Sequence, residues 1–253
     1  MSTGRRALEL CFERDGLRIR GELHLPAGDG PFPATICSHG FGATSATVEP
    51  YARFLAEHGV AGYRFDFCGG SSHSRSDGSL SDQSVLTEAA DLEAVLDGIR
   101  AQPLVRPDEV FLLGASQGGY VSGIVAARHP SAVRGLVMLY PALVIPDDAH
   151  ERYASPDDVP ERPVLFGVPI GRRYYTDAWG LDPDRDLAGY EGEVLIVHGE
   201  QDETVPLRYS ERAAGRYPRA RLVSIPGAGH GFHGEALSTA ERAILDLVVT
   251  ALG

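Results

Sequence analysis

The sequence predicts an α/β fold in which a mostly parallel central sheet carries helices on both faces and a small cap insertion covers one edge. Apolar runs of strand length alternate with amphipathic stretches of helix length along most of the chain. That alternation favours parallel strands joined by right-handed crossovers. It breaks between about residues 142 and 190, where prolines, aspartates and aromatic residues are mixed. Because ligands bind at the carboxyl edge of open α/β sheets, we interpret this segment as a cap over that edge.

The first two predicted strands, 7–14 and 17–25, meet at Asp15-Gly16, a dipeptide typical of a two-residue hairpin turn. Further strands are predicted at residues 34–38, 60–67, 110–114, 136–140, 194–197 and 221–225. Helices are predicted at residues 49–58, 84–101, 120–128, 207–216 and 235–251. A chain of 253 residues with 43% hydrophobic content suits one domain, residues 1–253, rather than two.

Composition excludes several classes of partner. The net charge of −12 argues against nonspecific binding to nucleic acid and against adhesion to an anionic membrane. The basic N-terminal residues are followed by no apolar segment, and no run is long enough to span a bilayer. The three cysteines, Cys11, Cys37 and Cys68, are scattered and lack metal-ligand spacing. We therefore expect a soluble, cytoplasmic protein with no disulfides, no bound metal and no membrane partner.

One motif indicates a nucleophile. Residues 114–118 read Gly-Ala-Ser-Gln-Gly, which fits G-x-S-x-G, and they lie between an apolar strand and a helix. In that context the pattern holds a serine, here Ser116, on a strained turn, with glycines relieving the crowding around it. An ordinary strand-to-helix turn is the alternative for so short a pattern.

A serine hydroxyl needs a base, and the base needs an acid that fixes its tautomer. After Ser116 the expected order is acid, then histidine. Asp202 follows the strand at 194–197, and His230 follows the strand at 221–225. Both lie at carboxyl ends of strands, so they are predicted to meet Ser116 at one edge of the sheet.

Other acidic residues and histidines near Asp202 and His230 could take the roles of acid and base. Glu200 and Glu203 flank Asp202, and we interpret them as solvated loop charges. His233 lies beyond the glycine-flanked turn that holds His230, so a place at the surface or just behind the site is expected. His198 stands at a strand end, where a structural histidine bound to backbone is common.

The oxyanion of an acyl-transfer reaction needs fixed N–H donors. The residue after the nucleophile, Gln117, supplies one backbone N–H in this kind of turn. The loop after an earlier strand supplies the other, and we assign it to Phe41 within His39-Gly40-Phe41-Gly42. The alternative is that this loop is only a tight turn.

At these motifs the chain resembles the α/β-hydrolase family over nearly its whole length. The segments that carry the resemblance are HGFG at 39–42, RFDF at 64–67, LLGASQGG at 112–119, LIVHGEQDETVP at 195–206 and GAGHGF at 227–232. The SQGG run, the FDF strand and the cap look most like the cinnamoyl (feruloyl) esterase branch, whose members cleave esters of hydroxycinnamic acids. The resemblance implies that the cap contacts the aromatic acyl group, with Asp148 and Tyr174 or Tyr175 at the ring hydroxyls.

The chain also departs from the family. The loop after the FDF strand often carries Arg or Asn before Gly-His-Gly, whereas here residues 68–71 read Cys-Gly-Gly-Ser. We interpret Cys68 as a packing residue, because no base or elbow surrounds it. The apolar and aromatic residues of the cap could line a pocket or form the cap's own core, and the sequence favours neither reading. They are Phe166, Tyr174, Tyr175 and Trp179.

The leading hypothesis is a serine esterase that cleaves carboxylic esters through an acyl-enzyme, with aryl or hydroxycinnamoyl esters implied by the resemblance. An amide- or thioester-directed enzyme of the peptidase or acyl-transfer type would use the same residues. A non-catalytic binder is the third hypothesis, since a fold does not by itself imply a function. The expected partner is a small-molecule ester, without a cofactor, and exposed cap aromatics leave a homodimer open.

Overall fold

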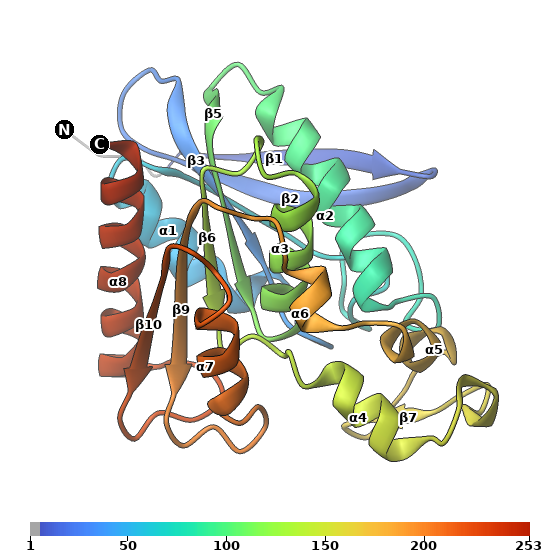
Figure 1. Ribbon diagram of the computed structural model, residues 1–253. Coiled ribbons are helices and arrows are strands. Elements are labelled where there is room, and N and C mark those ends of the chain that lie inside the picture. The colour runs from blue at the N-terminus through green and yellow to red at the C-terminus, as the bar shows by residue number, and fades with distance from the viewer. Residues whose placement is uncertain (1–5) are drawn as a thin grey trace.

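The computed structural model describes residues 6–253 and has the predicted α/β architecture (Figure 1). Eight strands form one sheet in the order β1-β2-β4-β3-β5-β6-β9-β10. Both neighbours of β2 pair with it antiparallel, and every other pair in this sheet is parallel, which confirms the mostly parallel sheet. Its strands are β1 (Arg6–Arg14), β2 (Leu17–Leu25), β3 (Phe32–Ser38), β4 (Ala61–Phe65), β5 (Val105–Ala115), β6 (Gly135–Leu139), β9 (Glu193–Gly199) and β10 (Ala220–Ile225).

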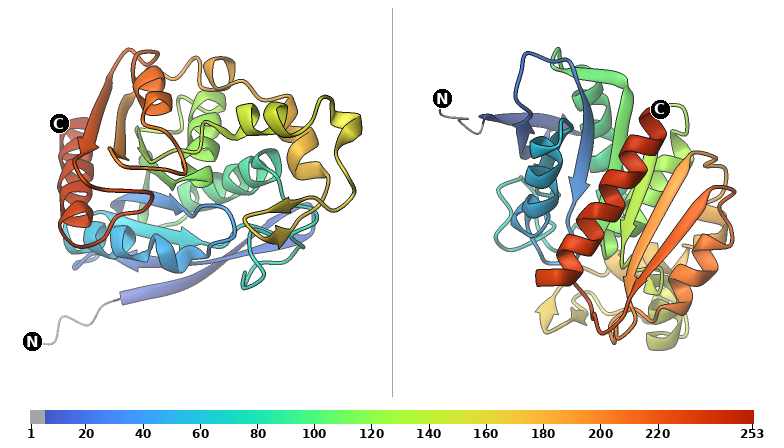
Figure 2. Two further views of the ribbon diagram at one scale, coloured as in Figure 1. Left: turned by 90° about the horizontal axis from the view of Figure 1, so that it is seen from below. Right: turned by 90° about the vertical axis from the view of Figure 1, so that its left-hand side faces the viewer.

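Helices cover both faces of the sheet (Figure 2). The pair α1 (Glu49–Glu57) and α8 (Gly234–Leu252) packs on one face. The other face carries α2 (Val85–Arg100), α3 (Gln117–Arg128) and α7 (Arg208–Ala214). A short 3-10 turn, η1 (Ser45–Thr47), precedes α1. The predicted three-layer arrangement is thus confirmed.

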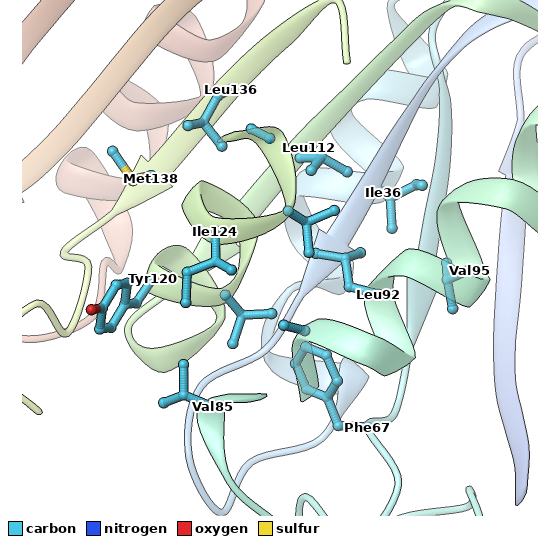
Figure 3. Packing of buried hydrophobic residues seen from close by; sticks show 14 of the residues in the cluster. Ile36, Phe67, Val85, Leu92, Val95, Leu112, Tyr120, Ile124, Leu136 and Met138 are labelled. Atoms are coloured by element: carbon cyan, nitrogen blue, oxygen red, sulfur yellow. The ribbon is translucent and has the colours of Figure 1, made fainter. Parts of the chain in front are cut away.

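The central strands are apolar on both sides because each side is covered. In β5, Phe111 and Leu113 pack in the cluster beneath α1 and α8, whereas Leu112 packs in the cluster beneath α2 and α3. Figure 3 shows the second cluster, in which Leu112 lies beside Leu136 and the helices above them. Alternate side chains of a strand point to opposite faces, so a strand buried on both faces reads as a continuous apolar run.

The predicted N-terminal hairpin is also confirmed. Asp15 and Gly16 connect β1 to β2 with φ angles of 51° and 80°. Positive φ at both central residues is the geometry of a type I′ turn, whose twist matches that of the flanking strands. Arg14 pairs with Leu17 directly at the turn.

Residues 142–190 hold short elements and no strand of the eight-stranded sheet. They are α4 (Ile145–Arg152), η2 (Pro156–Asp158), β7 (Val164–Leu165), β8 (Val168–Pro169), α5 (Arg173–Trp179) and α6 (Pro183–Asp186). The two strands among them, β7 and β8, pair with each other. Figure 1 shows α4, α5 and β7 beyond the carboxyl edge of the sheet, while α6 lies against α3. Tyr120 of α3 donates a hydrogen bond of 2.9 Å to Asp186, which anchors the end of the segment. Across residues 6–253, no helix combines the length and apolar character that a membrane crossing requires.

Candidate active site

Ser116 is the single residue between β5 and α3, and its backbone is strained as expected. Its φ of 55° and ψ of −120° lie in a region that residues with a Cβ seldom adopt. Two glycines make the turn possible. A Cβ at Gly114 would collide with the carbonyl of Gly118, and a Cβ at Gly118 would collide with the carbonyl of His39. The Ser116 N–H donates to Leu139 at 2.9 Å, so the turn is fixed to β6.

The loop after β10 brings His230 to this serine. Nε2 of His230 lies 2.9 Å from Oγ of Ser116, and Nδ1 lies 2.8 Å from Oδ2 of Asp202. The structure therefore brings together the three side chains that the sequence placed after three different strands. Each follows the carboxyl end of a parallel strand, and those ends share one edge of the sheet.

Asp202 is buried and fully engaged. Its Oδ1 accepts the N–H of Thr204 at 2.9 Å and the N–H of Val205 at 2.8 Å, which leaves Oδ2 to face His230. Hydrogen bonds from backbone N–H groups stabilise a carboxylate, so the loop holds this charge behind the imidazole. Its neighbours Glu200 and Glu203 are exposed, and Glu200 accepts from Ser224 instead.

The two other histidines near this site, His198 at the end of β9 and His233 before α8, lie where the sequence suggested. His198 is buried between Val205 O, 2.8 Å from its Nε2, and Ser210 Oγ, 2.6 Å from its Nδ1. Burial lowers the pKa of His198, so the ring stays neutral beside Asp202. His233 is exposed and precedes α8.

Two backbone N–H groups, the ones expected to bind an oxyanion, lack an acceptor near Ser116 among the described residues. Gly40 lies against the serine, since a Cβ built on it would be 3.0 Å from the Ser116 Cβ. Within residues 6–253, the N–H groups of Phe41 and Gln117 have no hydrogen-bond acceptor in the protein. His39 accepts the N–H of Phe67 at Nε2, and its Nδ1 lies 2.8 Å from the Gly40 carbonyl oxygen. That bond fixes the Gly40–Phe41 peptide, and with it the direction of the Phe41 N–H.

A cleft opens beside Ser116 under the segment 142–190. It is lined by Phe41, Ser116, Gln117, Ala142, Val144, Ile145, Asp148, Leu165, Phe166, Tyr174, Tyr175, Thr204 and Val205. A larger cavity, of about 310 Å³ against about 50 Å³ here, lies between α6 and α7. None of the three clustered side chains lines that larger cavity, so the smaller cleft is the candidate site.

The three cap residues expected at the acyl group have different surroundings. Asp148 lines the cleft, and burial raises the pKa of its carboxyl group. The hydroxyl of Tyr174 is buried and donates to Oε1 of Gln117 at 2.7 Å, so it is occupied within the protein. Tyr175 also lines the cleft, and its hydroxyl has no partner among the described residues. Trp179 packs on His150 and does not line the cleft, whereas Phe166 lines it and is 72% exposed.

Two acidic residues of α2 near the site were not identified from the sequence. Glu88 and Asp91 are buried, and Glu88 accepts a hydrogen bond of 2.8 Å from Nε2 of Gln117. The signal was present, because Glu88 falls on the same helical stripe as Val85 and Leu92. Asp91 binds the backbone N–H of Cys68, and burial raises the pKa of the Cys68 thiol to about 12. A thiol that keeps its proton is a poor nucleophile, as expected of a packing residue.

Comparisons with known proteins agree with this architecture. A family model described as "Serine aminopeptidase, S33" matches residues 31–157, and one described as "TAP-like protein" matches residues 177–251. The structure of Est1E from Butyrivibrio proteoclasticus with ferulic acid bound is 26% identical and superposes with a TM-score of 0.85, covering 95% of this chain and 99% of that one. This similarity confirms the resemblance to the feruloyl esterase branch.

The curated relatives include an uncharacterised protein and an acyltransferase. The uncharacterised protein YfhR of Salmonella typhi is 26% identical and aligns with 94% of this chain and 80% of its own length. The acyl-coenzyme A amino acid N-acyltransferase 2 of Rattus norvegicus is 25% identical over 86% of this chain. This chain spans only 53% of the length of that acyltransferase.

Proposed function

This chain belongs to the α/β-hydrolase family, and we propose that it is a serine hydrolase that cleaves carboxylic esters through an acyl-enzyme at Ser116. The observation that carries the proposal is the pair of contacts made by His230, 2.9 Å to Ser116 Oγ and 2.8 Å to Asp202 Oδ2. A nucleophile, a base and an orienting acid within hydrogen-bond reach are what this chemistry requires.

In the proposed reaction, His230 takes the proton of Ser116 as Oγ attacks the ester carbonyl carbon. The carbonyl oxygen becomes an oxyanion that accepts hydrogen bonds from the N–H groups of Phe41 and Gln117. His230 then gives its proton to the alkoxy group, which leaves as the alcohol. Water repeats the sequence on the acyl-enzyme, so that the carboxylic acid leaves and Ser116 regains its proton. Asp202 keeps His230 in the tautomer that accepts at Nε2.

We propose aryl-containing acids, including hydroxycinnamic acids, as the acyl groups, with residues 142–190 acting as the cap. Support comes from the similarity to a protein that binds ferulic acid and from the aromatic lining of the cleft. Phe41 lies 5.5 Å from the ring of Tyr174 and 6.1 Å from that of Phe166, so a flat acyl group would contact aromatic side chains. We propose Asp148 and the Tyr175 hydroxyl, which has no partner among the described residues, as contacts of a ring hydroxyl, because the Tyr174 hydroxyl is bound to Gln117.

The test of the reaction is a burst of nitrophenol from a nitrophenyl ester, followed by slower steady turnover as the acyl-enzyme hydrolyses. We expect a burst close to one equivalent per active chain. Steady turnover of several ester classes without any acylated intermediate detectable by mass spectrometry would remove the proposal.

The role of Asp148 makes a separate prediction. Replacing Asp148 with alanine should lower kcat/KM for methyl ferulate by about tenfold, because a hydrogen bond to the ring hydroxyl is lost. The same change should leave methyl cinnamate, which has no ring hydroxyl, within about twofold. Glu151→Ala removes an exposed carboxylate from the same helix and serves as the matched control. An equal loss on both esters would show that Asp148 does not read the hydroxyl.

Acyl transfer is a second candidate, favoured by the similarity to the acyl-coenzyme A amino acid N-acyltransferases. The same serine, histidine and aspartate would form the acyl-enzyme, and an amine would replace water in the second step. Parallel assays with an aryl ester, an aminoacyl amide and an acyl thioester, each with and without glycine as acceptor, rank the candidates. We expect the aryl ester to be cleaved fastest and glycine to have no effect on product identity.

A further inference from the structure

The side chain of Gln117 is held from two sides by buried groups. Its Nε2 donates to Oε2 of Glu88 on α2 at 2.8 Å, and its Oε1 accepts the hydroxyl of Tyr174 on α5 at 2.7 Å. All three residues are at most 4% exposed. A buried polar chain of this kind fixes the groups that it joins, because breaking it leaves unpaired atoms away from water.

This set of hydrogen-bonded side chains contacts both residues whose N–H groups are proposed to bind the oxyanion. Gln117 is one of them, and the ring of Tyr174 packs edge-on against the ring of Phe41, the other, at 5.5 Å. A second hydrogen bond, partly buried, runs from Ser84 Oγ at the start of α2 to Asp177 Oδ2 of α5 at 2.6 Å and ties the same two helices. Helix α5 is therefore joined to the turn at Ser116 directly, by Tyr174 and Gln117, and also through α2.

We propose that Glu88 is a positioning residue, which holds the Gln117 side chain and thereby fixes the oxyanion-binding N–H groups and the cap helix α5 in one arrangement. The inference rests on the proposed ester cleavage at Ser116. Glu88 itself touches neither Ser116 nor the cleft, since it is absent from the residues that line it.

The charge state of Glu88 decides whether it can do this. In the described residues no arginine or histidine pairs with it, and its Oε1 has no hydrogen-bond partner. Asp91 on the same helix is also an acid, and its Oδ1 accepts a hydrogen bond of 2.6 Å from Nε of Arg14. From α5, the titratable side chain in the network is Tyr174, and burial, with Glu88 adding to it, raises the pKa of Tyr174 well above its usual value. From α3, Gln117 faces it and carries no charge.

Burial raises the pKa of Glu88 to about 8, with the Gln117 hydrogen bond opposing the shift and Asp91 adding to it. The carboxyl group is therefore neutral at pH 7 and ionises as the pH rises through about 8. An ionised Glu88 would be a buried charge with one donor, Nε2 of Gln117, and no described partner at Oε1, so water would have to enter between α2 and α5 and disturb their packing. The proposal predicts that kcat falls above about pH 8, and that the fall is absent when residue 88 cannot ionise.

The experiment measures kcat and KM from pH 6 to 10 with a nitrophenyl ester in the full chain. In the wild type, kcat should fall at least about tenfold between pH 8 and 10, in proportion to the ionised fraction of Glu88. Glu88→Gln, a neutral group of the same shape, should retain kcat at pH 7 within about threefold and lose the alkaline fall. Glu88→Leu should lower kcat by about 10- to 100-fold at every pH, less than removing an oxyanion donor outright.

Matched variants and a folding readout keep the outcomes separate. Glu93→Gln, on the same helix but paired with Arg128 at the surface, should behave as the wild type throughout. Tyr174→Phe should lower kcat about 3- to 10-fold, because it removes the link to α5. Thermal unfolding and the amplitude of the nitrophenol burst report on folding and on the fraction of competent sites. If Glu88→Leu does not fold, the results for Glu88→Gln and Tyr174→Phe still test the proposal.

Two results overturn the inference: the same alkaline fall in Glu88→Gln as in the wild type, or an unchanged kcat in both Glu88→Leu and Tyr174→Phe. Either leaves the burst intact and the proposed function standing. If instead the wild type shows no burst and no acyl-enzyme at any pH, the proposed function itself has failed.

Discussion

Replacing Ser116 with alanine is expected to lower kcat/KM for an aryl ester by about 10³- to 10⁶-fold, because residues of such a set act as one unit. Without Oγ there is no atom 2.9 Å from His230 that can carry the acyl group. The N–H groups of Phe41 and Gln117 would remain, so residual turnover above the uncatalysed rate is expected. Steady-state kinetics with a nitrophenyl ester measure the loss, and the burst should vanish with it.

Ser122→Ala is the matched control for this change. Ser122 is buried on α3, and its hydroxyl has no partner among the described residues. Removing an unpaired hydroxyl should leave folding and kcat/KM within about twofold of the wild type. Comparable losses in both serine variants would mean that the effect comes from the helix and not from the nucleophile.

Replacing Asp202 with asparagine is expected to lower kcat by about 10⁴-fold while preserving the fold. The geometry gives the reason. Oδ1 is held by the N–H groups of Thr204 and Val205, so the oxygen of the asparagine amide must stay there. Its NH₂ group then faces His230 and donates to Nδ1. The ring must carry its proton on Nε2, the atom that has to accept the proton of Ser116.

The measurement is kcat as a function of pH for Asp202→Asn, with Glu203→Gln as the control because Glu203 is an exposed neighbour in the same loop. The control should match the wild type. Activity within about tenfold of the wild type in Asp202→Asn would mean that another group orients His230. His198, whose Nε2 lies 3.3 Å from Asp202 Oδ2, would then be the first residue to replace.

Much of the site could be predicted because its residues follow local rules. Ser116 directly follows β5, and Asp202 and His230 lie in the loops after β9 and β10, and parallel strands bring such positions to one edge. The strain at Ser116 was predictable from the glycines that flank it. The distances between the three side chains could not be predicted, because loops of different length follow the three strands.

The network behind the site could not be predicted, because its burial depends on α5, which lies within residues 142–190. Glu88 falls on the apolar stripe of α2, yet a single glutamate in an amphipathic helix usually faces water. It is buried because α5 packs over α2, and α5 lies in a segment whose prolines and glycines obscure any period. For the same reason the sequence could not show that the Tyr174 hydroxyl is bound to Gln117.

One helix boundary differed for a physical reason. The pattern predicted a helix from residue 120, whereas α3 begins at Gln117. Two successive glycines, Gly118 and Gly119, weaken helix propensity and hide the first turn in the sequence. Packing requires them, because a Cβ at Gly118 would strike the backbone of His39 and Ser38.

The most direct test of the central claim is labelling of the pure protein with a fluorophosphonate, followed by peptide mapping. The reagent reacts with a serine that a neighbouring base has activated. We expect one phosphonyl group per chain, on Ser116, with labelling slowed strongly in His230→Ala. An unlabelled protein that still hydrolyses the nitrophenyl ester, or a label on any other residue, would contradict the account.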